Sequence, residues 1–267
     1  MLDVNDQTFD TVSDEYGKKS LVQQKAARKL IELLAPRAGE SVLDVGCGPG
    51  HLTRLLTDAT GGRVVGTDIS GGMIEEAREK YPEIEFRRVA AEDLEYAEKF
   101  DVVFCNSTMQ WFANANGAVD RMHSGLKPGG RLGLACPSTP DFAPWFNEIV
   151  AAVAQAPEIK PTFEHWHNPW WHLPDIGAYQ AFFEKHDFAT RHIELEYEVN
   201  EFTVSEAFGI FSTGAAQCFA GRACYDVEIT DEYLDTFNRA VREEIERHAV
   251  AGLVKVDFNR LYYLGFK

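Results

Sequence analysis

Residues 42–53, VLDVGCGPGHLT, join a short apolar run to three alternating glycines, Gly46, Gly48 and Gly50. A glycine-rich loop directly after a strand is typical of nucleotide-binding α/β proteins, because the backbone can approach a ligand where no Cβ intervenes. Around this loop, short β-branched runs alternate with helical patterns through the first half of the chain. Strands that alternate with helices of this length predict crossover connections and a parallel sheet, which excludes all-α and all-β folds.

The residue pattern predicts strands in seven segments: 41–46, 63–68, 84–89, 101–106, 131–136, 191–199 and 256–266. Helical patterns cover about 20–35, 51–60, 71–80, 114–126, 144–155, 176–188 and a longer block near 204–249. We therefore expect an α/β fold: a doubly wound, mostly parallel seven-stranded, Rossmann-like sheet with helical lid insertions. One domain would span residues 1–267, with a core of about 36–139, 175–202 and 254–267 and insertions at about 140–174 and 203–253.

Composition narrows the classes of function. The formal net charge of −16 repels a phosphate backbone, so a small molecule or a carrier-bound group is a better substrate than nucleic acid. Five cysteines without a C-x-x-C pair indicate a reducing compartment rather than a disulfide framework or a zinc ribbon. No run of 18 apolar residues and no basic, apolar leader are present, so we expect neither a membrane span nor secretion, but a cytoplasmic protein.

The glycine loop does not suit a phosphate-rich nucleotide. A triphosphate loop needs a lysine that is absent here, and the third glycine of a dinucleotide fingerprint is replaced by His51. Asp68 ends the second predicted strand, 22 residues after Gly46, where a carboxylate can accept hydrogen bonds from ribose hydroxyls. Asp93 follows the third strand and suits the amine of an adenine. Ribose and adenine recognition without a phosphate site predicts S-adenosylmethionine as the cofactor.

Five motifs then follow one another in order across about residues 40–138: VLDVGCGPGHLT, VVGTDIS, AAEDL, FDVVFCNSTMQWF and LKPGGRLGLACPS. This ordered set resembles the class I S-adenosylmethionine-dependent methyltransferases. Within them, the chain is most similar to the trans-aconitate and malonyl-carrier-protein methyltransferases, through MQWF, FDTVSDEYGKKSLVQ near the start, and FSTGAAQ and VDFNRLYYLGF near the end. It departs from the trans-aconitate pattern after Thr213 and Gly214, where no basic residue follows until Arg222.

The resemblance implies a set of cofactor-binding residues at strand ends and near the start of the chain: Tyr16, Asp44, Gly46, Gly48, Gly50, Asp68, Ile69, Ala91, Glu92, Asp93 and Asn106. Asp44 would order the glycine loop or meet the amino acid end of the cofactor. Asp68 would hold the ribose hydroxyls, whereas Ile69 and residues 91–93 would line the adenine. Asn106 would face the methyl-transfer centre, and Tyr16 would close over the cofactor.

A methyl sulfonium is already activated, so the enzyme must chiefly align and desolvate the acceptor. A carboxylate acceptor is ionised at neutral pH and needs no base, which makes carboxylate O-methylation of a trans-aconitate-like acid or a carrier-bound malonyl group the leading hypothesis. The candidate catalytic residues are Gln110, Trp111, His167 and Arg222. The alternatives are a C-, N- or phenol O-methyltransferase acting on a larger apolar metabolite, and a non-catalytic cofactor-binding protein.

The stretch HWHNPWWH, residues 165–172, predicts an apolar lid over the acceptor. Its histidines, His165, His167 and His172, could bind a metal ion, but no carboxylate lies among them, so no metal site is expected. A base-dependent methyltransferase would instead use one of these histidines as a general base.

Overall fold

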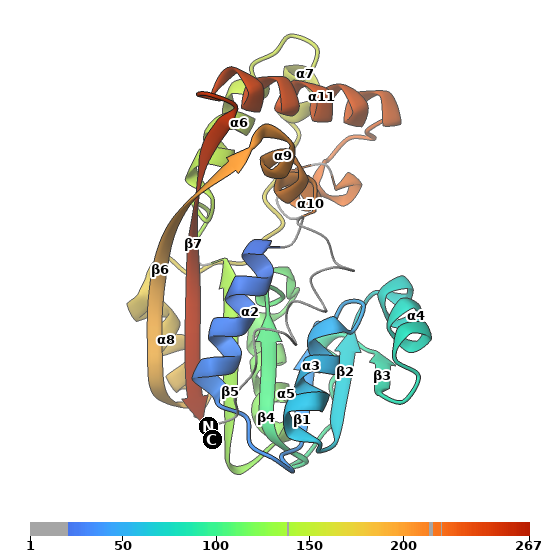
Figure 1. The fold of residues 1–267 in the computed structure, drawn as a ribbon, viewed down its shortest axis with the longest axis vertical. Helices are drawn as coiled ribbons and strands as arrows, with labels where there is room; N and C mark the ends of the chain where they lie inside the picture. The colour runs from blue at the N-terminus through green and yellow to red at the C-terminus, as the bar shows by residue number, and fades with distance from the viewer. Residues whose placement is uncertain (1–20, 138, 214–215, 220) are drawn as a thin grey trace.

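The computed structural model describes residues 21–137, 139–213, 216–219 and 221–267, and its centre is one mixed sheet (Figure 1). The strands lie in the order β3 (Glu85–Arg88), β2 (Val64–Asp68), β1 (Val42–Val45), β4 (Phe100–Asn106), β5 (Leu126–Pro137), β7 (Leu253–Phe266) and β6 (Ala189–Thr203). The first five are parallel, whereas β7 runs antiparallel to both β5 and β6. The predicted doubly wound, mostly parallel seven-stranded sheet is confirmed.

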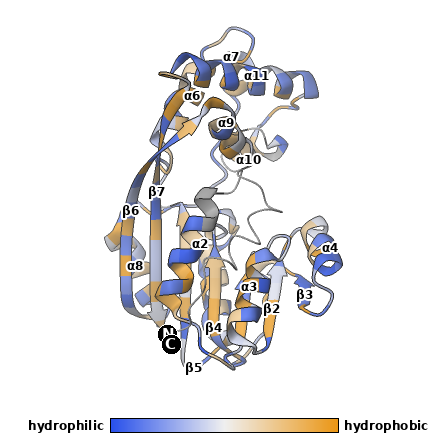
Figure 2. Ribbon diagram, in the orientation of Figure 1, coloured by the Kyte–Doolittle hydropathy of each residue, from blue (hydrophilic) through white to orange (hydrophobic). Residues whose placement is uncertain are grey.

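Helices cover both faces of this sheet because its strands alternate apolar side chains between the two faces. On one face, α2 (Leu21–Leu34) and α3 (His51–Thr60) share a buried cluster with β1, β4 and β7. On the other, α5 (Ala115–Gly125) and α8 (Ile176–Lys185) share a second cluster with the same strands. The helix α4 (Gly71–Lys80) packs at the β2–β3 edge, on the same face as α3. Apolar colour concentrates on the central strands in Figure 2.

Polar side chains explain where several helices begin. Ser70 accepts a hydrogen bond from the Met73 amide at the start of α4, and Asn114 accepts one from Gly117 at the start of α5. Asp175 plays the same part for α8. Such side chains satisfy backbone donors that have no partner within the helix, each contributing about 1 kcal/mol. These starts place α4 and α5 directly after the loops that follow β2 and the short 3-10 helix η3 (Met109–Trp111).

A separate group of helices lies beyond the carboxyl ends of the parallel strands, next to the extended upper parts of β6 and β7 (Figure 1). We call this group the cap. Its helices share one buried cluster: α6 (Pro144–Val153), α7 (Lys160–Phe163), α9 (Val204–Thr213), α10 (Ala216–Phe219) and α11 (Asp231–Arg247). The predicted division into a core and two insertions stays a prediction; the structure adds that helices from both proposed insertions pack in one cluster.

The helical block predicted near 204–249 is not continuous. Besides α9 and α10, a short 3-10 helix, η4 (Arg222–Cys224), precedes a non-helical stretch before α11. Thr230 begins α11 by accepting a hydrogen bond from the Tyr233 amide. Apolar periodicity could not reveal this interruption, because apolar residues between the helices, such as Tyr225 and Ile229, are also buried in the cap.

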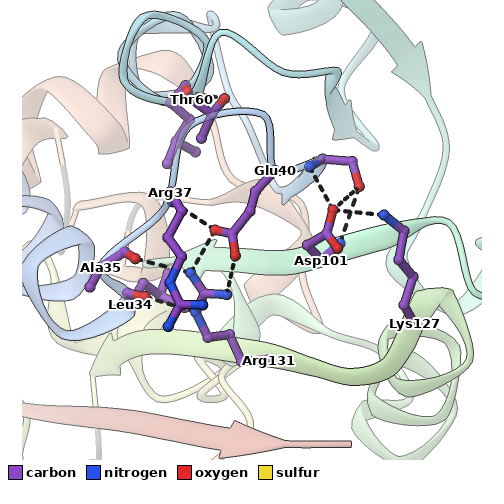
Figure 3. A network of polar contacts seen from close by, with 10 residues as sticks. Leu34, Ala35, Arg37, Glu40, Thr60, Asp101, Lys127 and Arg131 are labelled. Carbon is purple, nitrogen blue, oxygen red and sulfur yellow. Dashed lines mark hydrogen bonds and ion pairs between the residues drawn. The ribbon is translucent and has the colours of Figure 1, made fainter. Parts of the chain in front are cut away.

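An ion-pair network ties the opposite, amino ends of the strands together (Figure 3). Arg131 on β5 donates to both carboxylate oxygens of Glu40, at 2.9 and 2.8 Å, and also to the carbonyls of Leu34 and Ala35. Nearby, Asp101 accepts from Ser41 and from Lys127. This network joins the end of α2 to β5, and β1 to β4, far from the glycine loop. It therefore serves stability rather than the site.

No helix in the described part of the chain is long and apolar enough to cross a membrane. Among the same residues, no group of three or more His, Cys, Asp or Glu side chains is arranged to hold a metal ion.

Candidate active site

The glycine loop after β1 is built for close approach by a ligand. Gly46 and Gly48 have φ angles of 76° and 52°, in the left-handed region that favours glycine. A Cβ on Gly46 would lie 2.2 Å from the Thr108 side chain, so this loop packs tightly against the loop that follows β4. A Cβ on Gly48 would meet nothing within 4 Å. The backbone at Gly48 therefore borders open space, whereas Gly46 holds the two loops together.

Asp44, on β1, organises the loop from beneath. Its side chain is buried and accepts a 2.6 Å hydrogen bond from the Thr53 hydroxyl on α3. Burial raises the pKa of Asp44 to about 7, although the hydrogen bond from Thr53 opposes this shift. The contact joins β1 to the helix that follows the loop. Of the two roles expected for Asp44, it favours ordering the loop.

Asp68, at the end of β2, links the loop to the next helix. Its two carboxylate oxygens accept hydrogen bonds from the amides of Gly48, at 2.9 Å, and Ser70, at 2.8 Å. Each carboxylate oxygen has two lone pairs, so both keep capacity for further donors. The neighbouring side chain of Ile69 is 69% exposed, which is unusual for a large apolar residue. An exposed apolar side chain beside a carboxylate suits a nucleoside.

Residues 91–93 form a short 3-10 helix, η2 (Ala91–Asp93), after β3. Ala91 is buried, and Glu92 accepts a 3.0 Å hydrogen bond from the Asn114 amide next to α5. The Asp93 side chain is exposed. Of the residues predicted to border the adenine, Glu92 therefore makes a contact that orders the start of α5, whereas the carboxylate of Asp93 is exposed to solvent.

The loop after β4 is strained and carries unsatisfied polar atoms. Ser107 has a φ of 55°, a left-handed conformation that non-glycine residues adopt rarely. The Gln110 side chain, on η3 (Met109–Trp111), donates a 2.9 Å hydrogen bond to the Ser107 carbonyl. Asn106 Oδ1 and Gln110 Oε1 are buried without a hydrogen-bond partner in the described structure. Because such atoms cost free energy when left unpaired, this loop is suited to bind a ligand.

The predicted lid meets this loop. The Trp171 amide donates a 2.9 Å hydrogen bond to the Gln110 carbonyl, and the rings of Trp111 and Trp170 meet edge to face with centroids 5.3 Å apart. Trp170 Nε1 and both ring nitrogens of His172 are buried without a partner among the described residues. Burial also lowers the pKa of His172, which keeps its imidazole neutral at pH 7. Neutral polar groups of the lid therefore lie next to Gln110 and Trp111.

The structure does not bring two predicted catalytic residues to this loop. His167 is half exposed, 3.7 Å from Asp226, and its amide donates to the Cys224 carbonyl. Arg222 is also half exposed and donates to the Ile229 carbonyl and the Asp231 carboxylate. Both are held within the cap, because Trp166 and Tyr225 pair as an isolated β-bridge. The acceptor roles of His167 and Arg222 stay predictions, and the contacts described for both residues lie within the cap.

Sequence reasoning missed Arg260 on β7, whose Nη1 donates a 3.2 Å hydrogen bond to the Ser107 hydroxyl. A single arginine inside the apolar strand VDFNRLYYLGF was the available signal. Thr53 and Thr108 were also missed: both lie inside the quoted motifs, but nothing in the sequence distinguishes their side chains from those of their neighbours. Tyr16, which the sequence predicts to close over the cofactor, lies outside the described residues.

Comparison with known proteins identifies the fold and the family. A family model described as a methyltransferase domain matches residues 42–130. A trans-aconitate 2-methyltransferase of Rhodopseudomonas palustris is 32% identical over 196 residues, which cover 63% of this chain and 76% of the relative. A malonyl-[acyl-carrier protein] O-methyltransferase of Acetivibrio thermocellus is 36% identical over 132 residues, 48% of this chain. The match covers about half the length of the first curated relatives, 47% and 52%.

A solved structure of a putative methyltransferase from Bacillus halodurans aligns with a TM-score of 0.61 at 17% identity, covering 91% of this chain and 99% of that one. It shares the fold. Together with the site, these matches define the class: the chain belongs to the class I S-adenosylmethionine-dependent methyltransferases. Within that class, it belongs to the group that includes the trans-aconitate and malonyl-carrier-protein methyltransferases.

The residues present fit the cofactor of that family. Open space beside Gly48, spare acceptor capacity on Asp68 and the exposed side chain of Ile69 suit a nucleoside with ribose hydroxyls. Cys47, within the loop, is buried, and burial raises its pKa far above the ordinary range, so it is not a nucleophile. The glycine loop contains no lysine that could bind a phosphate.

Proposed function

We propose that this protein transfers the methyl group of S-adenosylmethionine to a carboxylate oxygen of a small or carrier-bound acid. The observation that carries the proposal is the set of neutral polar groups beside Gln110 and Trp111. Trp170 Nε1 and the His172 ring nitrogens are buried there without partners in the described structure. Neutral N–H donors can orient a carboxylate without neutralising its negative charge, so the carboxylate remains nucleophilic. S-adenosylmethionine supplies a methyl group bound to a positively charged sulfur.

The chain's own residues divide the remaining work. Asp68 binds the ribose hydroxyls, residues 69 and 91–93 border the adenine, and the backbone at Gly48 allows close approach. The unpaired oxygens of Asn106 and Gln110 can only accept hydrogen bonds, so they suit donors of the cofactor rather than the acceptor carboxylate. Trp111 and Trp170 exclude water, which raises the reactivity of a carboxylate that would otherwise be hydrated. No side chain needs to remove a proton, because the acceptor is ionised at neutral pH.

A second candidate function is supported by His172. Its imidazole is neutral and has no partner for either ring nitrogen in the described structure, so it could accept a proton from a phenol, an amine or a carbon acid. The carboxylate acceptor is preferred because the relatives with related sequences are named for carboxylate methylation. A protein that only binds the cofactor would not explain the unpaired polar atoms on the lid side.

A labelled-methyl assay tests the proposal. The purified protein is incubated with S-adenosylmethionine carrying a radioactive methyl group and, separately, trans-aconitate, a malonyl thioester of a carrier protein, a phenol and an amine. We expect label in a product that mild alkali releases as methanol, since methyl esters hydrolyse and N- or C-methyl groups do not. Alkali-stable label would establish the second candidate. Binding of S-adenosylhomocysteine without any turnover would favour a cofactor-binding protein.

A further inference from the structure

Arg260 lies on β7, opposite Pro137 of β5 on one side and Glu196 of β6 on the other. Its half-buried guanidinium has five N–H donors, of which the described structure gives one a partner, the Ser107 hydroxyl. Glu196 is instead bound by Lys29 at 2.8 Å. Within the described ranges, no carboxylate lies at ion-pair distance from Arg260. The guanidinium thus keeps both its charge and most of its donors available.

Arg260 contacts the loop after β4, which carries the proposed acceptor site. Ser107, which it contacts, accepts the hydrogen bond from the Gln110 side chain. The adjacent residue, Asn259, donates its amide to the Phe142 carbonyl at 2.7 Å. Phe142 in turn packs against Trp170, with ring centroids 4.4 Å apart.

These contacts close a ring. Trp170 meets Trp111, and the Trp171 amide returns to the Gln110 carbonyl. The ring runs from the loop after β4, through β7 and the segment before α6, to the lid. This circuit of backbone hydrogen bonds and aromatic contacts therefore links the Arg260 guanidinium to the neutral donors of the lid, Trp170 and His172.

We propose that Arg260 binds a second, non-reacting carboxylate of the acceptor; this inference rests on the proposed function. A guanidinium binds a carboxylate through two parallel hydrogen bonds and neutralises its charge. That interaction would weaken a nucleophile, so it suits the carboxylate that does not react. The neutral groups of Trp170 and His172 suit the carboxylate that does. Two anionic groups favour a free di- or tricarboxylate over a malonyl thioester, which has a single carboxylate.

The test uses Arg260→Gln and Arg260→Lys, with Arg239→Gln on exposed α11 as a control for the loss of one surface charge. The ligands are trans-aconitate and an analogue in which every carboxylate except the reacting one is converted to an amide. Binding of each to the protein saturated with S-adenosylhomocysteine is measured by calorimetry, so the readout does not depend on turnover. Binding of S-adenosylhomocysteine alone reports whether each variant is folded.

We expect Arg260→Gln to weaken trans-aconitate binding about 30-fold or more, Arg260→Lys about tenfold, and Arg239→Gln not at all, as for loss of a charge-assisted bidentate contact. Affinity for the amide analogue should change much less, because it has no second carboxylate for Arg260 to bind. Equal losses for both ligands, or no loss for trans-aconitate, would overturn the inference. If the wild-type protein methylates trans-aconitate and Arg260→Gln binds it normally, this inference fails while the proposed function stands; if it binds trans-aconitate through Arg260 and methylates no carboxylate, the proposed function fails.

Discussion

The backbone N–H of Trp171 donates a 2.9 Å hydrogen bond to the backbone carbonyl of Gln110. This bond joins a lid segment to η3, which follows β4; Gln110 lies 61 residues before Trp171 in the chain. Since the contact is between backbone atoms, it places the lid next to the acceptor site whatever rotamers the tryptophans adopt. The neighbouring amide of His167, by contrast, is bound within the cap. The lid therefore has one end in the cap and the other at the active site.

Ligands should stabilise this contact. We expect hydrogen exchange of the Trp171 amide to slow about tenfold when S-adenosylhomocysteine and a carboxylate acceptor are both bound, since lids that close over a site open less often when it is occupied. The Trp166 amide, which donates to Phe163 within the cap, should not change and serves as the internal control. Identical exchange of Trp171 with and without ligands would make the segment a static part of the fold.

The pH dependence of activity separates the two candidate reactions. Burial lowers the pKa of His172 below its ordinary value of 6.5, so the imidazole stays neutral between pH 6.5 and 8.5. With a carboxylate acceptor, which stays ionised down to about pH 5, kcat/KM should be nearly flat over this range and also below the pKa of His172, and His172→Gln should cost about tenfold or less, as for a lost hydrogen bond.

A base-dependent reaction predicts a different profile. The rate would then fall about tenfold per pH unit below the pKa of His172, and His172→Gln would remove this limb together with most of the activity. His167→Gln is the matched control, because His167 is half exposed beside Asp226 and should leave the profile unchanged. Observing the limb in the wild type, and its loss only in His172→Gln, would replace the carboxylate assignment.

Asp68→Ala should weaken S-adenosylhomocysteine binding by about 2–4 kcal/mol, roughly 30- to 1000-fold, because the variant loses charge-assisted bonds to the ribose and the amide contacts that hold Gly48. Calorimetry measures the affinity. Asp58→Asn, which breaks an exposed pair with Arg54, is the control and should bind normally. Unchanged affinity in folded Asp68→Ala would remove this residue from the cofactor site.

The network at the amino ends of the strands should appear in stability, not activity. Arg131→Met leaves the little-exposed Glu40 carboxylate with only Arg37 as a nearby cation, so the free energy of unfolding in urea should fall by about 3 kcal/mol. The double variant Glu40→Gln/Arg131→Met should lose less stability than Arg131→Met alone, since it leaves no buried carboxylate without its partner. Arg63→Met, at the more exposed pair with Glu85, should cost below about 1 kcal/mol. Similar costs at both sites would contradict this account.

Asp101 should make part of the stability depend on pH. Although burial alone would raise its pKa, hydrogen bonds from Lys127 and Ser41 lower it from 3.8 to about 2. A carboxyl whose pKa is lower in the folded state stabilises the fold above pH 4, and this contribution is lost as the pH falls toward 2. Asp101→Asn should therefore be less stable than wild type at pH 6, with a gap that narrows by pH 3. A gap independent of pH would mean that the charge of Asp101 contributes nothing.

The order of strands and helices could be predicted from the sequence because it rests on local properties. Alternation of apolar residues and the cap residue at the start of each helix act within a few positions. The predicted strand 101–106 is observed as Phe100–Asn106, and the predicted helix 71–80 as Gly71–Lys80. The helical block near 204–249 was less accurate, because buried residues between its helices continue the apolar pattern.

The conformation of the glycine loop could also be predicted from the sequence, since Gly46, Gly48 and Asp68 lie in contiguous motifs whose backbone conformation depends on their own residue types. The residues of the proposed acceptor site could not be predicted in this way. Ser107 and Arg260 are 153 residues apart and meet only because β7 pairs with β5 next to the end of β4. No local pattern encodes such a meeting, and none shows that His172 rather than His167 lies beside the loop after β4.

The sequence by itself thus determined the class of fold, the family motifs and the position of the cofactor loop, each of which follows from short-range periodicity and glycine conformation. Only the tertiary structure decided which charged groups and ring nitrogens lie around the proposed acceptor site. The physical reason is that a side chain's partners, and hence its unpaired atoms, depend on the packing of distant segments. Arg222 is occupied by Asp231 for that reason, whereas Arg260 has no carboxylate partner among the described residues.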